Sequence, residues 1–265
     1  MYKAVCLDLD GTLLDDNKKI SEENKEAIKY VQSKEGQIIL CSGRQINLMK
    51  DYKDEINASE YVIGCNGAII YDYKNNQSIF EANVAEDLVD NLYDYCIRNN
   101  YLARIDTKYA RYISDMNYFI SKEVKMEENI NKFINENKVL QFTIGTKTEN
   151  QIDEVIEYVN SLNRKDIKIE NRYHIKTKQF EIWAINIINK NASKGNAING
   201  LCKYLKINID EVIAIGDDLN DISMIKTVGC GVAMGNAKEK VKEFAKEVTL
   251  SNNENGVSKI LRNKF

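Results

Sequence analysis

Four short apolar segments of the sequence are each followed by polar side chains that could take part in catalysis. The segments are Ala4–Leu7, Gln37–Cys41, Tyr61–Cys65 and Val212–Ile215, and the groups after them are Asp8 with Asp10, Ser42, Asn66, and Asp217 with Asp218. In an open α/β sheet, ligands bind beyond the carboxyl ends of the parallel strands. We therefore expect these groups to converge at one edge of a sheet.

Five carboxylates would meet at that edge, namely Asp8, Asp10, Asp217, Asp218 and Asp221. Like charges at close range repel each other, so such a group needs a cation among its members. Hard oxygen ligands without a nearby histidine favour Mg²⁺ over zinc or copper. The sequence therefore predicts a magnesium site.

The first pair of carboxylates lies in the segment Asp8-Leu9-Asp10-Gly11-Thr12. Positions two apart at a strand end lie on the same side of the chain, and Gly11 allows the backbone to turn tightly under a ligand. Two carboxylates in different surroundings can divide the work of a nucleophile and of an acid-base group.

Alternating strands and helices must hold these groups in place. A helix is predicted after Ser21, whose hydroxyl can cap it, and another from about Gly195. A further strand, Gly229–Ala233, leads to Asn236, which is placed to cap a helix that reaches Ala245. This alternation indicates a Rossmann-like α/β fold, with a parallel sheet covered by helices on both faces.

The middle of the chain has a different order of elements. It contains a helix around Leu88–Leu92, two strands within Tyr101–Ser114, a helix near Glu128–Asn137, a strand at Val139–Gly145, a helix around Ile152–Val159, and strands near Ile167–Tyr173 and Gln179–Ile185. Helices on paired strands form an α+β layer of their own. We predict a core domain of residues 1–83 and 188–265, interrupted by an α+β cap domain of residues 84–187.

The composition is that of a soluble globular protein. The 265 residues are 43% hydrophobic and 29% charged, with a formal net charge of -3. So small a charge does not favour nucleic acid or an anionic membrane as a partner. No apolar run is long enough for a membrane helix, and the first one is too short for a signal peptide. We expect a cytoplasmic protein that is a monomer or a weak dimer.

Four motifs, in this order, resemble those of the haloacid dehalogenase superfamily. They are Asp8-Leu9-Asp10-Gly11-Thr12-Leu13-Leu14, Ser42-Gly43-Arg44, Ala192-Ser193-Lys194-Gly195-Asn196-Ala197 and Gly216-Asp217-Asp218-Leu219-Asn220-Asp221. Two later segments, Val232–Ala237 and Asn255–Val257, resemble signatures of the Cof-type phosphatases in that superfamily. The likeness spans essentially the whole chain, and the middle segment corresponds to the type IIB cap of the family.

The resemblance implies a catalytic role for three residues. Asp8 would be the nucleophile, and Asp10 would be the general acid and then the general base. Lys194 would neutralise phosphate charge and orient Asp8. Mg²⁺ would be held by Asp8, by the backbone carbonyl of Asp10 and by Asp217.

The resemblance also implies contacts with the phosphate group. Ser42 would donate a hydrogen bond to a phosphoryl oxygen; the family usually carries threonine there, and serine keeps the hydroxyl. Backbone N–H groups of the first loop, at Leu9, and of Gly43 would help, and Asn220 would touch the phosphate side. Two acids would have supporting roles. Asp221 would position Lys194, and for Asp218 two roles stay open, as a metal ligand or as an outer-shell or solvated residue.

These roles together predict magnesium-dependent hydrolysis of small phosphate monoesters through an aspartyl-phosphate on Asp8. Asp10 must be protonated to serve a leaving alkoxide near neutral pH, and we expect nearby carboxylates to raise its pKa. Arg44 is interpreted as structural or cap-facing rather than catalytic.

The substrate is expected to be a small phosphorylated metabolite, and a sugar phosphate is the default interpretation. Two alternatives remain open. A phosphomutase of related fold would form the same aspartyl-phosphate but pass the phosphoryl group to a second sugar hydroxyl. A non-enzymatic protein that binds phosphorylated metabolites would be expected to lack Asp8, Asp10 or Lys194, and all three are present.

Overall fold

The computed structural model describes the chain except for residues 1, 116–124, 127–129, 131–132, 135–136 and 178–179. The chain divides into two compact units. The core unit comprises Met1–Phe80 and Ala192–Phe265, and the cap unit comprises Glu81–Asn191. The insertion predicted from the sequence, residues 84–187, begins and ends a few residues inside the cap unit.

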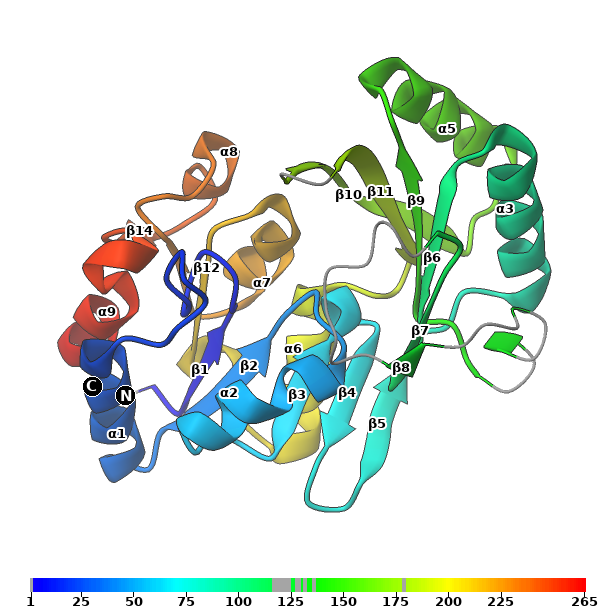
Figure 1. The fold of residues 1–265 in the computed structure, drawn as a ribbon. Coiled ribbons are helices and arrows are strands. Elements are labelled where there is room, and N and C mark those ends of the chain that lie inside the picture. The colour runs from blue at the N-terminus through cyan, green and yellow to red at the C-terminus, as the bar shows by residue number, and fades with distance from the viewer. Residues whose placement is uncertain (1, 116–124, 127–129, 131–132, 135–136, 178–179) are drawn as a thin grey trace. The chain divides into compact units, whose positions relative to one another are not determined.

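The core unit is built on an eight-stranded sheet with the strand order β14-β13-β12-β1-β2-β3-β4-β5 (Figure 1). The strands are β1 (Ala4–Leu7), β2 (Gln37–Cys41), β3 (Tyr61–Gly64), β4 (Ile69–Asp72), β5 (Gln77–Glu81), β12 (Val212–Gly216), β13 (Cys230–Ala233) and β14 (Glu247–Val248). Strand β1 pairs in parallel with both β2 and β12, which come from opposite ends of the chain. The predicted α/β, Rossmann-like fold is confirmed.

One edge of this sheet departs from the predicted parallel arrangement. Strand β4 runs antiparallel to β3, with Ile63 paired to Ile70. Only a short turn at Cys65–Gly67 separates the two strands, and a parallel connection needs a crossover of a dozen or more residues. The sheet is therefore mixed.

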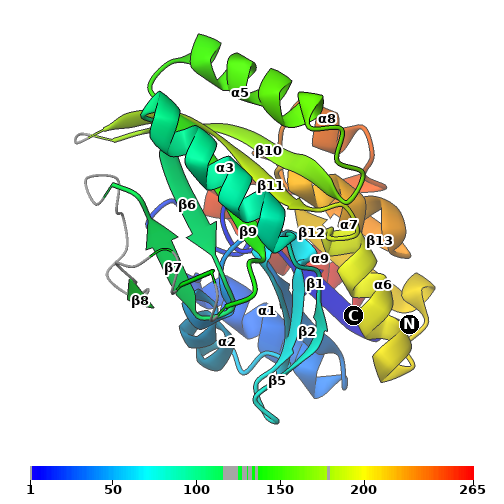
Figure 2. The ribbon, with the colours of Figure 1, turned by 90° about the vertical axis from the view of Figure 1, so that its right-hand side faces the viewer.

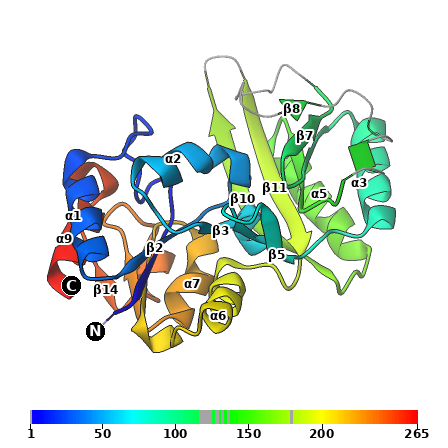
Figure 3. The same ribbon diagram turned by 90° about the horizontal axis from the view of Figure 1, so that it is seen from below.

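Two helices of the core unit begin at serine hydroxyl caps. The helices of this unit are α1 (Glu22–Ser33), α2 (Lys50–Glu55), α6 (Lys194–Leu205), α7 (Ile222–Thr227), α8 (Glu239–Lys242) and α9 (Gly256–Lys264). The hydroxyl of Ser21 accepts the N–H of Asn24 at the start of α1, and that of Ser193 accepts the N–H of Asn196 at the start of α6. Helix α1 packs against α9, and α6 packs against α7 (Figure 3).

The prediction that Asn236 caps a helix was wrong. Helix α8 begins later, after Lys238, and ends at Lys242. The Asn236 amide instead donates to the carbonyl of Gly11 (Nδ2···O 2.8 Å) and accepts from the N–H of Asn252 (3.0 Å). Its side chain thus joins the loop after β1 to the loop before α9, a tertiary role that local sequence does not reveal.

The cap unit contains a six-stranded sheet with the order β10-β11-β9-β6-β7-β8. Its elements are α3 (Glu86–Asn99), β6 (Leu102–Asp106), β7 (Ala110–Ile113), β8 (Lys125–Met126), β9 (Gln141–Thr146), α5 (Glu149–Ser161), β10 (Ile167–Lys176) and β11 (Glu181–Asn189). The α+β order of the cap matches the prediction. The helix predicted near 128–137 lies largely outside the described residues.

Helices α3 and α5 lie over one face of the cap sheet (Figure 2). Side chains alternate along a strand, so Ile105 of β6 and Ile144 of β9 pack toward the helices. Arg104 and Asp106 belong to the opposite face of β6. The main apolar core of the cap therefore lies under the helices, and the other face carries a polar cluster together with a small apolar cluster of Leu102, Ile113 and Ile182.

Candidate active site

Parallel strands of the core sheet end side by side, and their last residues lead into the predicted site. Leu7 lies beside Ile215 in one neighbouring strand and beside Leu40 in the other. The N–H of Asp8 still donates to the carbonyl of Ile215 (N···O 3.1 Å), so the pairing holds up to the predicted nucleophile. The register thus carries Asp8, Ser42 and Asp217 to the same edge.

Lys194 connects two of the acidic residues. Its Nζ lies 2.5 Å from Asp8 Oδ1 and 2.6 Å from Asp221 Oδ1, and its side chain is fully buried. Burial alone would lower the pKa of Lys194, but the charges of Asp221 and Asp8 outweigh burial and raise that pKa. The ammonium group is therefore held in its charged form.

Asp221 links this lysine to the loop after β12. Its second oxygen, Oδ2, accepts the backbone N–H groups of Asp217 (2.9 Å) and Asp218 (3.0 Å). Thr12, a buried residue to which the sequence assigned no separate role, donates from Oγ1 to Asp217 Oδ1 (2.9 Å). These bonds fix the first and last loops of the site to each other.

The acidic cluster formed by Asp8, Asp217 and Asp221 holds more negative charge than its own lysine balances. One carboxylate oxygen from each residue lies within 4.8 Å of the others. Burial, opposed by Lys194 and reinforced by Asp221 and Asp217, raises the pKa of Asp8 well above its usual range. Burial and the charge of Asp221 raise the pKa of Asp217 to about 7.

A divalent cation would relieve this imbalance. Carboxylate oxygens in a buried group are the donors that a hard cation such as Mg²⁺ prefers. In the part of the chain that the structure describes, Lys194 is the one cation in ion-pair contact with the acidic cluster. The residues present therefore fit a divalent metal.

Asp10 has quite different partners from Asp8. Two nitrogens of Arg44 contact its two carboxylate oxygens, both at 2.7 Å, and Lys18 Nζ lies 2.7 Å from Oδ1. Burial favours a higher pKa, but the hydrogen bonds and charges of Arg44 and Lys18 outweigh it and lower the pKa of Asp10 to about 2. The expectation that neighbouring carboxylates raise this pKa was wrong, because the side chain pairs with two cations.

Sequence reasoning missed the part that Arg44 and Lys18 take in the site. Arg44 was interpreted as structural or cap-facing, yet it contacts the predicted general acid and stacks over the ring of Tyr52 (5.1 Å). Its position two residues after Ser42, in the same loop, was the available signal. Lys18 gave no signal, since it lies in the turn that leads away from the first motif.

The predicted phosphate contacts lie on the loops that follow these strands. Ser42 is buried, and its Oγ accepts the N–H of Arg44 (3.2 Å). Asn220 donates from Nδ2 to Oδ1 of Asn66 (2.9 Å). Leu9 is buried, and its carbonyl accepts the N–H of Leu14 (2.9 Å), which folds the first loop back on itself. Contacts from Leu9, Ser42, Gly43 and Asn220 to phosphate stay predictions.

Asp218 lies apart from the acidic cluster. Its Oδ1 pairs with Lys238 Nζ at 2.5 Å, and both side chains are about half exposed. Its carboxylate also accepts the N–H of Leu219 (2.6 Å) at the start of the short turn Leu219–Asp221. An exposed ion pair of this kind contributes little stability, so Asp218 serves mainly the shape of the loop.

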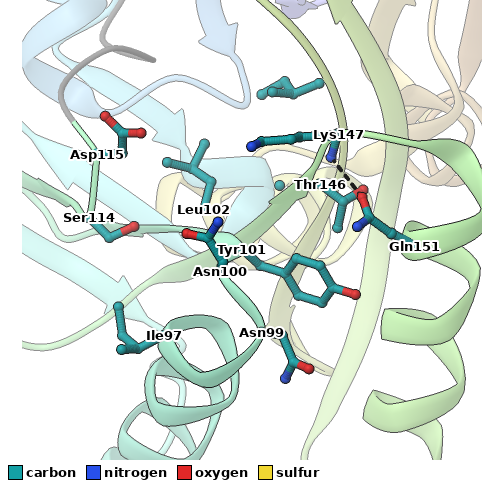
Figure 4. A pocket seen from close by; sticks show the side chains of 12 residues that line it. Ile97, Asn99, Asn100, Tyr101, Leu102, Ser114, Asp115, Thr146, Lys147 and Gln151 are labelled. Atoms are coloured by element: carbon teal, nitrogen blue, oxygen red, sulfur yellow. Dashed lines mark hydrogen bonds between the residues drawn. The ribbon is translucent and has the colours of Figure 1, made fainter.

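The cap unit contains a cavity of about 460 Å³ near the end of α3 and the start of α5 (Figure 4). Its polar groups largely serve local structure. Gln151 accepts the N–H of Lys147 (3.2 Å), Ser114 accepts the N–H of Ala103 (3.0 Å), and Asn99 donates to the carbonyl of Tyr95 (2.8 Å). The acidic cluster of the core unit is therefore the better candidate for the active site.

Comparison with known proteins agrees with this geometry. The family model for haloacid dehalogenase-like hydrolases matches residues 5–261. This chain belongs to that family. Two Bacillus subtilis relatives carry the names "Putative phosphatase YxeH" (33% identical; 97% of this chain and 96% of the relative covered) and "5-amino-6-(5-phospho-D-ribitylamino)uracil phosphatase YcsE" (29%; 98% and 94%).

Solved structures agree in fold over the full length. A haloacid dehalogenase-like hydrolase from Bacteroides thetaiotaomicron superposes with a TM-score of 0.83 at 26% identity, covering 100% of both chains. The subclass IIB sugar phosphatase BT4131 superposes with a TM-score of 0.78 at 23% identity, covering 98% of both, and this match concerns the fold alone. The chain is thus a phosphatase of the haloacid dehalogenase type with a type IIB cap.

Two further observations bear on this phosphatase. The superfamily generally uses a divalent metal, and the buried acidic cluster is suited to one. Among the described residues, no helix combines the length and apolar character needed to cross a membrane.

Proposed function

We propose that this phosphatase hydrolyses small phosphate monoesters through an aspartyl-phosphate formed on Asp8, with Mg²⁺ as its metal. The observation that carries the proposal is the fully buried Lys194 between Asp8 and Asp221, in a cluster with surplus negative charge. A structural ion pair would need one carboxylate for each cation. A surplus of carboxylates instead suits a site that receives a metal and a phosphoryl group.

Asp8 is the nucleophile in this proposal. One of its oxygens attacks phosphorus in line while the ester P–O bond breaks, and the phosphoryl group passes to the carboxylate. Lys194 holds the attacking side chain in place, since its ammonium contacts Oδ1. The same positive charge offsets the charge of the phosphoryl oxygens.

Asp10 is the general acid and then the general base in this proposal. It gives a proton to the departing alkoxide, then takes one from the water that attacks the phosphorus of the acyl-phosphate, which releases phosphate and restores Asp8. A carboxylate paired with Arg44 and Lys18 can accept a proton but has none to give. These ion pairs must therefore loosen, and Asp10 must take up a proton from solvent, before the first transfer.

Mg²⁺ would be held by Asp8, the backbone carbonyl of Asp10, and Asp217. When bound, it supplies positive charge that a phosphoryl group needs as a nucleophile approaches. Asp221 is already engaged by Lys194 and by two backbone N–H groups, so we assign it to support rather than to the metal.

Ser42, Asn220 and the backbone N–H groups of Leu9 and Gly43 would bind the remaining phosphoryl oxygens. We propose sugar phosphates or similar metabolites as substrates. A relative named for 5-amino-6-(5-phospho-D-ribitylamino)uracil makes a phosphorylated ribityl compound a specific member of the test panel.

The test is phosphate release from p-nitrophenyl phosphate and from a panel of sugar phosphates, with Mg²⁺ and with EDTA. We expect steady release with Mg²⁺ and loss of activity with EDTA that Mg²⁺ restores. Activity that survives exhaustive chelation would contradict the metal assignment. Isomerised sugar phosphate with little free phosphate would instead indicate a phosphomutase.

A further inference from the structure

The turn between β3 and β4 has an uncommon backbone and lies beside the active-site loops. Cys65 and Asn66 both have positive φ angles, 47° and 57°, and both side chains are buried. Two successive residues of this kind, neither of them glycine, are rare. Such conformations persist where the surrounding structure holds them, and they gather at functional sites.

Backbone hydrogen bonds tie this turn to the loop that carries Ser42. The N–H of Asn66 donates to the carbonyl of Ser42 (3.1 Å), and the N–H of Cys65 donates to the carbonyl of Arg44 (2.9 Å). A Cβ atom at Gly43 would lie only 2.9 Å from Asn66 Oδ1. The Asn66 amide therefore packs directly against the predicted phosphate-binding turn.

The same turn contacts the start of α6. Gly67 has a φ of 88°, and a Cβ there would lie 2.2 Å from the backbone of Ser193 and 2.7 Å from the backbone nitrogen of Lys194. Only glycine fits this approach. The turn thus supports the helix end from which Lys194 reaches Asp8.

The side chain of Asn66 also meets the last motif. Asn220 donates to Asn66 Oδ1, while Asn220 Oδ1 is buried and has no hydrogen-bond partner among the described residues. Rotating both side-chain amides by 180° would exchange the positions of their oxygen and nitrogen atoms. Asn66 would then donate to Asn220 instead. The Asn220 NH₂ group would then occupy the position of the unpartnered oxygen and could donate to a phosphoryl oxygen, which can only accept.

We propose that Asn66 is a positioning residue for phosphoryl binding. Its side chain orients the Asn220 amide so that the N–H faces the phosphoryl group, while its backbone N–H, which Asn66→Gly retains, holds the loop that carries Ser42. This inference rests on the proposed phosphatase function.

Two variants separate the amide from the backbone turn. Asn66→Gly keeps the positive φ and removes the amide. Asn66→Asp keeps the shape but can only accept, so it holds the Asn220 N–H toward itself and away from the phosphoryl group. The matched control is Asn57→Gly, at an exposed residue with a φ of 48° in the turn after α2.

We expect kcat/KM for p-nitrophenyl phosphate to fall about 10- to 100-fold in both Asn66 variants, as for loss of one donor to a developing anion. Asn57→Gly should match the wild type. Inhibition by orthovanadate should weaken in parallel with kcat/KM, while the Mg²⁺ concentration for half-maximal activity should stay unchanged. A merely structural defect would shift the Mg²⁺ requirement and the melting temperature as well.

A double-mutant cycle with Asn220→Ala decides whether Asn66 acts through Asn220. We expect Asn66→Gly to cause almost no further loss in the Asn220→Ala background. Additive losses, or unchanged vanadate inhibition in Asn66→Asp, would overturn the proposal. Should the wild type itself neither release phosphate nor bind vanadate, the proposed function fails and not the role of Asn66 alone.

Discussion

The core unit and the cap unit each bury aspartate, but they treat its charge in opposite ways. In the core, Asp8, Asp217 and Asp221 have one lysine among them, and burial with mutual repulsion raises the pKa of Asp8 and Asp217. In the cap, Asp106 contacts two arginines, with Arg111 Nε at 2.5 Å and Arg104 Nε at 3.0 Å. Burial alone would raise the pKa of Asp106, but the charges of these arginines outweigh burial and lower that pKa.

We propose that the difference separates a structural cluster from a catalytic one. A buried carboxylate whose negative charge is compensated by arginines does not need a further cation, and removing the carboxylate leaves the arginines uncompensated. A cluster with surplus charge is costly to fold and is retained where its ligand supplies the missing charge. By this criterion we propose the acidic cluster of the core as the functional one.

Replacing Asp8 should give the largest effect and should separate activity from stability. We expect Asp8→Asn to lower kcat at least about 1,000-fold, since it removes the proposed nucleophile. Its melting temperature should be equal to or above that of the wild type, because one repulsive charge is gone. Phosphate release measured with Mg²⁺, and thermal unfolding measured without metal on the same preparation, check both statements.

Metal should stabilise the core by neutralising the surplus charge. Mg²⁺ at about 100 times its dissociation constant should add about 2.7 kcal/mol to the free energy of unfolding. For a chain of this size that corresponds to a rise in melting temperature of roughly 5–10 °C. Asp217→Asn should reduce the rise sharply, and the cap variant Asp106→Asn, as the control, should keep it.

Removing the cap carboxylate should reverse the pattern seen at Asp8. Asp106→Asn leaves Arg104 and Arg111 without their shared partner, and we expect a loss of about 2 kcal/mol in the free energy of unfolding. This expected loss is smaller than the loss from breaking a fully buried ion pair, because both arginines are partly exposed. A stability equal to that of the wild type in urea unfolding would remove the contrast between the units.

Lowering the pH should remove the contribution of Asp106 to the free energy of unfolding. The variant Asp106→Asn, which lacks this contribution, should be less affected. The pKa of Asp106 is lowered on folding, so its stabilisation is complete above the pKa of an unfolded aspartate, about 3.9. The contribution is lost as pH falls through the lower pKa of the folded state. The stability difference between wild type and Asp106→Asn should therefore shrink below about pH 4, and a difference independent of pH would contradict the assignment.

Much of the site could be predicted from the sequence because it lies at the ends of buried strands. Apolar runs such as Ala4–Leu7 mark the strands, and the polar residue that follows each run marks the sheet edge. The contact between Lys194 and Asp8 depends on that register together with the Ser193 cap of α6. Local patterns therefore placed the acidic residues at the sheet edge, whereas the role of Lys194 was implied by the resemblance to a family.

Other features depend on contacts that local patterns do not encode. The pairing of Asp10 with Arg44 and Lys18 depends on the orientation of three side chains. This pairing lowers the pKa of Asp10, whereas the sequence led us to expect a raised pKa. Asn236 was expected at a helix start, but its amide forms hydrogen bonds with two loops that are distant in sequence. The antiparallel β4 had a possible signal in the short turn after β3, where Asn66-Gly67 favours a hairpin.

The most direct test of the account is to identify the phosphorylated residue. Enzyme mixed with p-nitrophenyl phosphate and Mg²⁺ is quenched in acid within one turnover, digested, and analysed by mass spectrometry. We predict one added phosphoryl group on the peptide that contains Asp8, absent from Asp8→Asn. Full turnover with the phosphoryl group on another residue, or undiminished turnover in Asp8→Asn, would contradict the central claim.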